Sequence, residues 1–231
     1  MLDPTGTTFR AYVKAFPPGS RGLVNELVGW RLHRARGLPT APRAFVALVP
    51  VAKLRHYHPD ATWLQGRAEP LWPAWVTEAL PTRHRGYNND ATRRAQLCQW
   101  PDLHAAIAMR EALHDIDCHG GNYVPLSLEP PQFAALDFAE SLGGQGWTAQ
   151  QLEELDYLHN KLLYDTVGLP SDLDQHKLEA SGAAHWDAWK AAEPELLYWW
   201  QGLLRNPADR DSLHTTLARR LAAGWLKGRW K

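Results

Sequence analysis

The chain has 231 residues, 45% of them hydrophobic and 22% charged, which is typical of one or two folded domains and excludes a disordered, collagen-like or coiled-coil chain. Its 25 basic and 25 acidic side chains cancel, so the overall charge gives no reason to expect direct nucleic-acid binding. Its two cysteines are too few for a disulfide scaffold and are not spaced for zinc. No apolar run reaches the ~20 residues of a membrane span, and the first residues lack a signal-peptide pattern. We therefore expect a cytoplasmic protein without membrane contact.

The first fifty residues predict a strand, a helix and a second strand. Residues 9–16 are rich in β-forming side chains and follow a turn-prone Asp-Pro-Thr-Gly segment. Apolar side chains then recur at helical spacing from Leu23, and Gly37 followed by Pro39 predicts the end of that helix. Residues 44–49 form an apolar run of strand length.

The rest of the chain is interpreted as a connector followed by mostly helical structure. Residues 51–90 contain several prolines and are interpreted as an irregular connector between lobes, with a short strand at residues 74–77. Residues 122–125 and 133–138 flank a proline-rich turn and predict a hairpin. Helices are expected over residues 91–115 (broken near Trp100), 148–167 (starting with a Thr148–Gln151 capping box), 171–180, 184–205 and 210–226.

The densest polar stretch, residues 114–122 (HDIDCHGGN), lies between a predicted apolar helix and a predicted strand. Loops that a rigid scaffold positions often carry function. Asp137 follows Asn122 by fifteen residues, near the end of the next apolar run. Carboxylate and amide oxygens are ligands that Mg²⁺ accepts, together with phosphates and water. Asp117, Asn122 and Asp137 are therefore expected to form an oxygen-rich magnesium site.

Four segments, in this order, resemble HipA-like kinases and the lipid kinases related to them. Residues 117–122 (DCHGGN) resemble the Asp-Arg-His-x-x-Asn catalytic loop, and residues 135–140 (ALDFAE) look like the Asp-Phe-Gly-type segment that follows it. Residues 12–14 (YVK) resemble the strand with the nucleotide-binding lysine. Glu26 resembles the helix-borne glutamate that pairs with this lysine. The resemblance covers about residues 5–145.

The sequence departs from the family pattern at three places. Position 118 is Cys instead of Arg, and Ala139 stands where many kinases have Gly. Thirteen residues precede Lys14, and among them only residues 5–8 (TGTT) fit a phosphate-binding turn. We therefore expect a truncated N-lobe whose phosphate-binding part is reduced or is supplied by a partner chain.

The resemblance implies a two-lobed α+β protein-kinase-like fold, with a small β-containing N-lobe over residues 1–80 and a mostly helical C-lobe over residues 81–231. It implies a kinase that uses ATP and Mg²⁺ to phosphorylate a protein Ser/Thr hydroxyl, as toxin kinases of toxin–antitoxin systems do. The expected partners are the protein substrate and an antitoxin or small-lobe protein.

The resemblance also implies a role for each residue of the polar loop. Asp117 would accept or orient the proton of the attacking hydroxyl, and Asn122 and Asp137 would hold Mg²⁺ against the β- and γ-phosphates. His119 would brace the loop through hydrogen bonds. Such roles suit phosphoryl transfer, which depends mainly on positioning and charge stabilisation.

On the opposite side of the nucleotide, Lys14 would contact the α- and β-phosphates and Glu26 would align it. The hinge that receives adenine is placed at residues 76–80, so that Glu78 and Leu80 are expected to bind nucleotide.

A metal-dependent phosphohydrolase is a first alternative. The doublet His114-Asp115 could bind a divalent metal, with His84, His104 or His159 completing the set. The predicted strands argue against the all-helical scaffold of such enzymes.

The second alternative is a catalytically degenerate kinase fold that binds a protein through its C-terminal tryptophans. Twelve tryptophans occur in the chain, and most of those near the C-terminus are expected to pack inside the helical part. Since neighbours on a helix cannot face the same way, at least one of Trp199 and Trp200 should be partly exposed. The tryptophans concerned are Trp186, Trp189, Trp199, Trp200, Trp225 and Trp230.

Overall fold

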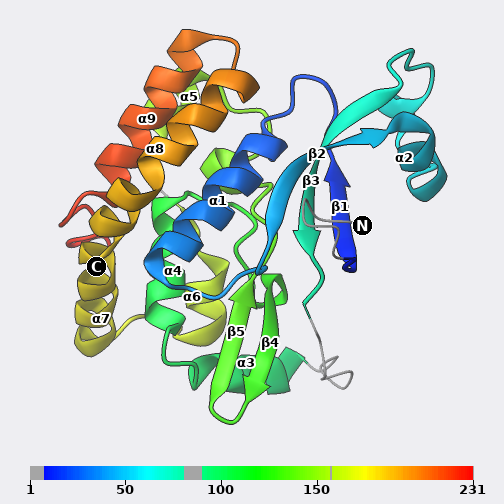
Figure 1. Cartoon of the computed structure of the whole chain (residues 1–231). Helices are drawn as coiled ribbons and strands as arrows, with labels where there is room; N and C mark the ends of the chain where they lie inside the picture. Colours follow the sequence, from blue (N-terminus) through cyan, green and yellow to red (C-terminus); the bar gives the residue numbers. More distant parts are fainter. Residues whose placement is uncertain (1–7, 81–89, 157, 231) are drawn as a thin grey trace.

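The computed structural model describes residues 8–80, 90–156 and 158–230, and it combines two small antiparallel sheets with helices in a mixed α/β fold (Figure 1). The strands are β1 (Ala11–Ala15), β2 (Ala44–Pro50), β3 (Leu71–Glu78), β4 (Tyr123–Leu128) and β5 (Pro131–Ala135). The helices are α1 (Gly22–Arg36), α2 (Val51–Tyr57), α3 (Asp90–Cys98), α4 (Leu103–Ala112), α5 (Ala149–Glu154), α6 (Lys161–Thr166), α7 (Asp172–Ala183), α8 (His185–Leu203) and α9 (Pro207–Leu221), with short 3-10 helices at η1 (Thr62–Leu64), η2 (Gly120–Asn122) and η3 (Ser141–Gly143).

The first sheet has the strand order β1-β3-β2, and both outer strands run antiparallel to β3. The interpretation of residues 51–90 as an irregular connector was therefore wrong over its described part, because β3 is the central strand and α2 precedes it. The short strand expected at residues 74–77 is confirmed, as part of the longer β3. Pro73 made the first residues of this strand hard to predict, because proline is unfavourable inside a sheet. It pairs with Leu48 of β2 but lies just beyond the stretch of β3 that pairs with β1, so its missing N–H removes no bond to β1.

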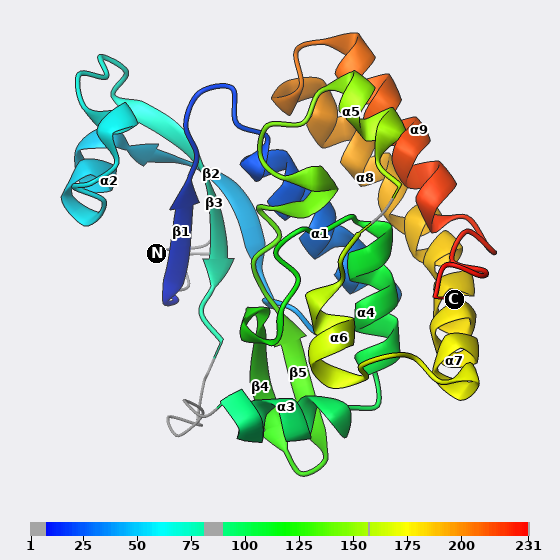
Figure 2. The same ribbon diagram turned by 180° about the vertical axis from the view of Figure 1, so that it is seen from behind.

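Helix α1 lies between this sheet and the C-terminal helices α8 and α9, as Figures 1 and 2 show from opposite sides. It ends where the sequence predicts, at Gly37, whose φ of 80° suits a residue without a side chain. Gly29 allows α1 to approach Phe138 closely, because a Cβ at this position would collide with the Phe138 ring. Packing thus fixes α1 to the segment that follows Asp137.

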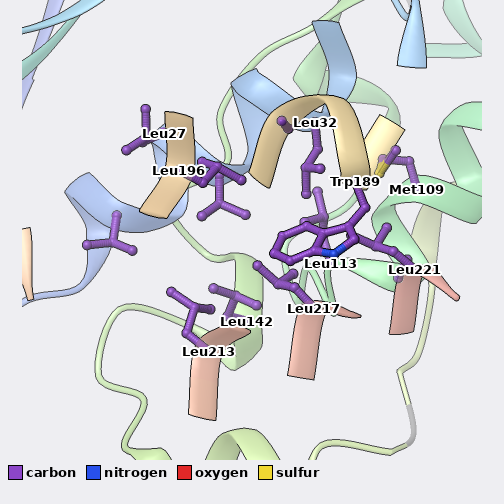
Figure 3. Packing of buried hydrophobic residues seen from close by; sticks show 14 of the residues in the cluster. Leu27, Leu32, Met109, Leu113, Leu142, Trp189, Leu196, Leu213, Leu217 and Leu221 are labelled. Atoms are coloured by element: carbon purple, nitrogen blue, oxygen red, sulfur yellow. The ribbon is translucent and has the colours of Figure 1, made fainter. Parts of the chain in front are cut away.

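The main core is formed by apolar side chains of α1, α4, α8 and α9, mostly leucines, around Leu142 of η3 (Figure 3). Trp189 and Trp200 are buried there, while Trp199 is half-buried, as expected for adjacent positions on one helix. The other three C-terminal tryptophans are also half-buried and pack against the core clusters. No helix in the described residues has both the length and the apolar composition needed to cross a bilayer.

The second sheet is the predicted hairpin of β4 and β5. The polar loop leads into β4 and Asp137 follows β5, so both lie at the open end of the hairpin, where Tyr123 pairs with Ala135. The break between α3 and α4 also falls where the sequence predicts. The helix expected over residues 148–167 is instead two helices. Its capping box at Thr148 forms, but α5 ends at Glu154 and Asn160 caps α6. The buried Asn160 side chain also donates to the Ile107 carbonyl, a tertiary contact that favours a new helix start there.

Candidate functional site

Lys14, Glu26 and Asp137 converge at one point, although they come from β1, from α1 and from the end of the hairpin. The Lys14 Nζ lies 2.6 Å from Glu26 Oε1 and 2.9 Å from Asp137 Oδ1. Glu26 is buried, while Lys14 and Asp137 remain partly open to solvent. Two acids and one ammonium group therefore share a site that a ligand can reach from outside.

Burial and the neighbouring charges together set the pKa values of these three groups. Burial by itself would lower the pKa of Lys14, but the charges and hydrogen bonds of Glu26 and Asp137 outweigh it and raise that pKa. Burial raises the pKa of Glu26 although Lys14 opposes the change. Burial acts in the same direction on Asp137, but the hydrogen bond and the charge of Lys14 prevail and lower its pKa. Lys14 is thus a firmly protonated cation at neutral pH, and Asp137 is an ionised acid.

Asp137 occupies a strained backbone conformation, with φ of 56° in a residue other than glycine. Such conformations cost about 1–3 kcal/mol and persist only where the surroundings enforce them. Arg110 on α4 supplies that restraint: its guanidinium donates to the carbonyls of Leu136 and Asp137 at 2.7 and 2.8 Å. The same group lies 4.3 Å from the centre of the Phe138 ring.

Arg110 also fixes the polar loop. It forms a fully buried ion pair with Asp115, and the other carboxylate oxygen of Asp115 accepts the backbone N–H of Asp117 at 3.1 Å. One buried cation therefore positions both Asp117 and Asp137. The charge of Asp115 stabilises the protonated Arg110, and its pKa rises despite burial.

Asn122 and His119 hold the loop from within. The Asn122 amide donates to the Asp117 carbonyl at 2.7 Å, and the Asn122 carbonyl accepts from Leu136 N at 2.8 Å. His119 Nδ1 accepts the backbone N–H of Gly121 at 2.9 Å, which is the bracing role expected for it. The Asn122 amide nitrogen is used for Asp117, and within the described residues its Oδ1 is left to accept from a ligand or to bind a cation.

Asn25 connects helix α1 to the segment after Asp137. Its amide nitrogen lies 2.7, 2.7 and 3.0 Å from the carbonyl oxygens of Ala139, Ser141 and Gly144, and its Oδ1 accepts from Trp147. The side chain is fully buried. Since Glu26 is the next residue, this network fixes the helix position that presents Glu26 to Lys14.

Two cavities meet at Lys14 and Asp137, which line both of them. The first, called the Thr77 cavity, has a volume of about 320 Å³ and is lined by Thr77, Trp30 and Asn122 among others. The second, called the Trp63 cavity, has a volume of about 430 Å³ and contains Asp117 in its wall. The candidate catalytic acid thus lies on one side of the Lys14–Asp137 pair, and Asn122 lies on the other.

The predicted hinge fits the geometry only in part. Thr77, at the end of β3, lines the Thr77 cavity, but among the described residues neither Glu78 nor Leu80 does. Glu78 instead forms an ion pair with Arg43, with Nε and Oε2 2.9 Å apart. Its carboxylate therefore lies at the end of the sheet where β2 begins and β3 ends, called the rim of the sheet below. Of the predicted phosphate-binding turn, residues 5–7 lie outside the described residues.

The His-Asp doublet does not resemble a metal centre. Asp115 pairs with Arg110, and His114 lies beside the guanidinium of Arg220. Burial, followed by the charges of Arg220 and Arg229, lowers the pKa of His114 to about 4. Within the described ranges no three His, Cys, Asp or Glu residues form a group that could hold a metal.

The other histidines proposed as metal ligands have other surroundings. His104 contacts Asp174 and His159 stacks on Tyr164, while His84 lies outside the described residues.

Asn25 and Arg110 are functional candidates that sequence reasoning missed. Arg110 had a weak signal, because it interrupts an otherwise apolar helical stripe of Ala, Ile and Met residues. Asn25 had none, because an asparagine beside Glu26 is indistinguishable in sequence from one on a helix surface.

Comparison of the chain with family models, with curated proteins and with solved structures finds no match.

Proposed function

We propose that this chain is an ATP-dependent kinase with a two-lobed protein-kinase-like fold, and that it phosphorylates a protein Ser/Thr hydroxyl with Mg²⁺ as cofactor. The N-lobe is assigned to residues 1–80 and the C-lobe to residues 81–231. The observation that carries the proposal is the convergence of Lys14, Glu26 and Asp137 between two cavities, one of which contains Asp117. These residues occur in the order of the HipA-like pattern, and their proximity supports the roles proposed for them.

The Thr77 cavity is the proposed nucleotide site. Its wall includes the aromatic or apolar side chains of Tyr12, Trp30 and Leu136, which offer contacts to a base, and it also includes Lys14. A protonated lysine held between two acids presents a fixed positive charge to phosphate oxygens. When phosphate oxygens replace Asp137 as a partner of Lys14, the Asp137 carboxylate becomes free to bind a cation.

Magnesium fits the donor set at this place. Asn122 offers an amide oxygen and Asp137 a carboxylate, and Mg²⁺ is commonly held by one or two protein oxygens together with phosphates and water. Bound there, the cation would neutralise charge that develops on the phosphates. Asp117, partly exposed on the loop, then accepts or orients the proton of the acceptor hydroxyl. Arg110 keeps the backbone at Asp117 and at Asp137 in fixed positions relative to each other.

A toxin–antitoxin setting, with a partner protein that silences or completes the small lobe, belongs to the same proposal. In the described residues β1 is an edge strand that pairs with β3 alone. Ala79 N donates to Arg10 O across this pair, so by alternation the backbone groups of Ala11, Val13 and Ala15 are directed away from β3. An unpaired edge of this kind can accept a strand from a partner.

The proposal is tested by nucleotide binding and by transfer of labelled phosphate. Wild-type protein with Mg²⁺ and γ-labelled ATP should bind nucleotide and should label itself or an added protein. Asp117→Ala should retain nucleotide binding but lose at least a hundredfold in labelling, in line with a lost proton-transfer group, while Lys14→Met should weaken both. Asp187→Ala, at an exposed site on α8, is the matched control and should behave as wild type.

If the wild-type chain binds no nucleotide, the kinase proposal is contradicted, and a degenerate kinase fold that acts as a binding protein becomes the favoured function. Phosphomonoester hydrolysis that is lost in His114→Ala would instead favour the phosphohydrolase.

A further inference from the structure

The Trp63 cavity has two chemically different walls. One is apolar and includes Phe16, Pro17, Trp63 and Leu64, from the loop after β1 and from the η1 turn between β2 and β3. The other is acidic and comes from the catalytic-loop region and the segment after Asp137, with Asp117 and Glu140. The cavity is open to solvent, so a chain segment can lie along it.

The two acids have no strong cationic partner in the described residues. Asp117 has only His119 nearby, with Oδ1 and Nε2 3.6 Å apart. The Glu140 carboxylate accepts a hydrogen bond from the neutral amide of Gln145 at 2.5 Å. Lys14 also lines the cavity, but Glu26 and Asp137 already balance its charge. The cavity therefore presents uncompensated negative charge to a ligand beside its apolar wall.

We propose that the Trp63 cavity is the acceptor site and that the acceptor is a basic polypeptide segment, with a Lys or Arg next to the Ser or Thr that is phosphorylated. This assignment rests on the proposed kinase function. The basic head group lies against Glu140, and its aliphatic stem and neighbouring side chains pack on Trp63 and Phe16. The acceptor hydroxyl then faces Asp117, across Lys14 and Asp137 from the nucleotide.

In the transfer step, the acceptor oxygen forms a bond to the γ-phosphorus. The bond from that phosphorus to the β–γ bridging oxygen breaks, and its electron pair leaves with ADP. The hydroxyl proton passes to Asp117 and then to solvent. The step requires no oxidant or reductant. It places the acceptor and the nucleotide in different cavities, which agrees with Lys14 and Asp137 lining both.

The test uses the full chain with Mg²⁺, γ-labelled ATP and three sets of Ser/Thr peptides, in which the residues beside the acceptor are basic, neutral or acidic. The basic set should have the lowest KM. Glu140→Gln should raise the KM for basic peptides about two- to fivefold, the range expected for a partly exposed charge pair, with the kcat and the KM for ATP unchanged. Glu140→Lys should reverse the preference in favour of acidic peptides. Glu154→Lys, an exposed charge change on α5, is the control and should leave the preference as it is.

The outcomes separate this inference from the function on which it rests. If the wild-type chain binds no nucleotide and transfers no label, the kinase proposal fails. If it transfers label but prefers neutral or acidic peptides, or if Glu140→Lys leaves the preference unchanged, the acceptor assignment is overturned while the kinase proposal stands. Labelling of hydroxylated small amines without labelling of any peptide would also overturn it.

Discussion

The sheet that carries Lys14 and the helical part, against which the segment after Asp137 packs, differ greatly in how they are held together. The buried cluster that belongs to the sheet and α2 alone consists of Val51, Leu54 and Leu64. The helical part contains a continuous core with Trp189, Trp200 and many leucines, which Trp75 of β3 joins. Helix α1 belongs to the second core by its packing. Glu26 and Asp137 are therefore positioned by the same core, and Lys14 reaches them from the thinner part.

This difference indicates where the site is rigid and where it can respond. Buried polar networks around Arg110 and Asn25 fix the acids, and such networks are costly to break. The edge strand β1 has little buried surface to fix it, so ligand or partner binding should act on the Lys14 side. The predictions below test this contrast between the two parts.

The largest effect is expected from Arg110→Met in the helical part. The substitution leaves Asp115 as a buried charge without a partner, and breaking a buried pair in this way costs about 3–5 kcal/mol. Urea unfolding measured by fluorescence gives the loss. The double variant Arg110→Met with Asp115→Leu should recover a substantial part of it. An equal loss in both variants would show that the carbonyl contacts of Arg110 dominate instead.

Acid should weaken the same part through its buried histidines. Burial, with the charge of Arg36, lowers the pKa of His185 to about 3, and the pKa of His114 is about 4. The unfolded chain protonates these rings below about pH 6.5, but the folded chain does not. Stability is therefore present above pH 6.5 and falls as the pH decreases toward 4, by about 2 kcal/mol for each ring at pH 5.

Unfolding midpoints measured between pH 8 and pH 5 test this sign. His185→Phe should make the profile less steep, because it removes one of the rings whose pKa is lowered. A profile equally steep in His185→Phe would contradict the assignment.

A smaller effect is expected where α1 meets Phe138. The Cβ of Gly29→Ala would collide with the Phe138 ring, and overpacking of this kind costs about 1–3 kcal/mol. It should also weaken nucleotide binding by shifting Glu26. Gly202→Ala on α8 is the matched control, because its Cβ meets nothing and alanine favours helix. Equal thermal unfolding midpoints for the two variants would mean that α1 can move away from Phe138 without cost.

The smallest effect is expected at the rim of the sheet. Arg43 and Glu78 form a partly exposed ion pair, and such pairs contribute about 0–1 kcal/mol. Arg43→Met should therefore change the unfolding free energy by less than any of the substitutions above, and 0.5 M salt should reduce its effect further. If Arg43→Met lowers the free energy of unfolding as much as Arg110→Met does, the proposed contrast between the two parts is contradicted.

Much of the local structure could be predicted from the sequence. Apolar spacing and Gly37 predict α1, and the two apolar runs on either side of a proline-rich turn predict the hairpin. The four segments that resemble HipA-like kinases include Lys14, Glu26 and Asp137, the three residues that converge in the structure. Of the central strand β3 only residues 74–77 were predicted, because Pro73 is tolerated only where β1 has already ended, which no local pattern reveals. Likewise, Glu78 is drawn to Arg43, thirty-five residues away, and thus away from the Thr77 cavity.

What the sequence by itself determined is therefore the identity and the chain order of the chemical groups, because caps, turns and side-chain periodicity act over a few residues. Only the tertiary structure decided which groups meet. The contacts of Arg110 with Asp137, and of Asn25 with the loop that follows it, join positions far apart in the chain. Their free energy exists only after the core has excluded water and brought the two segments together.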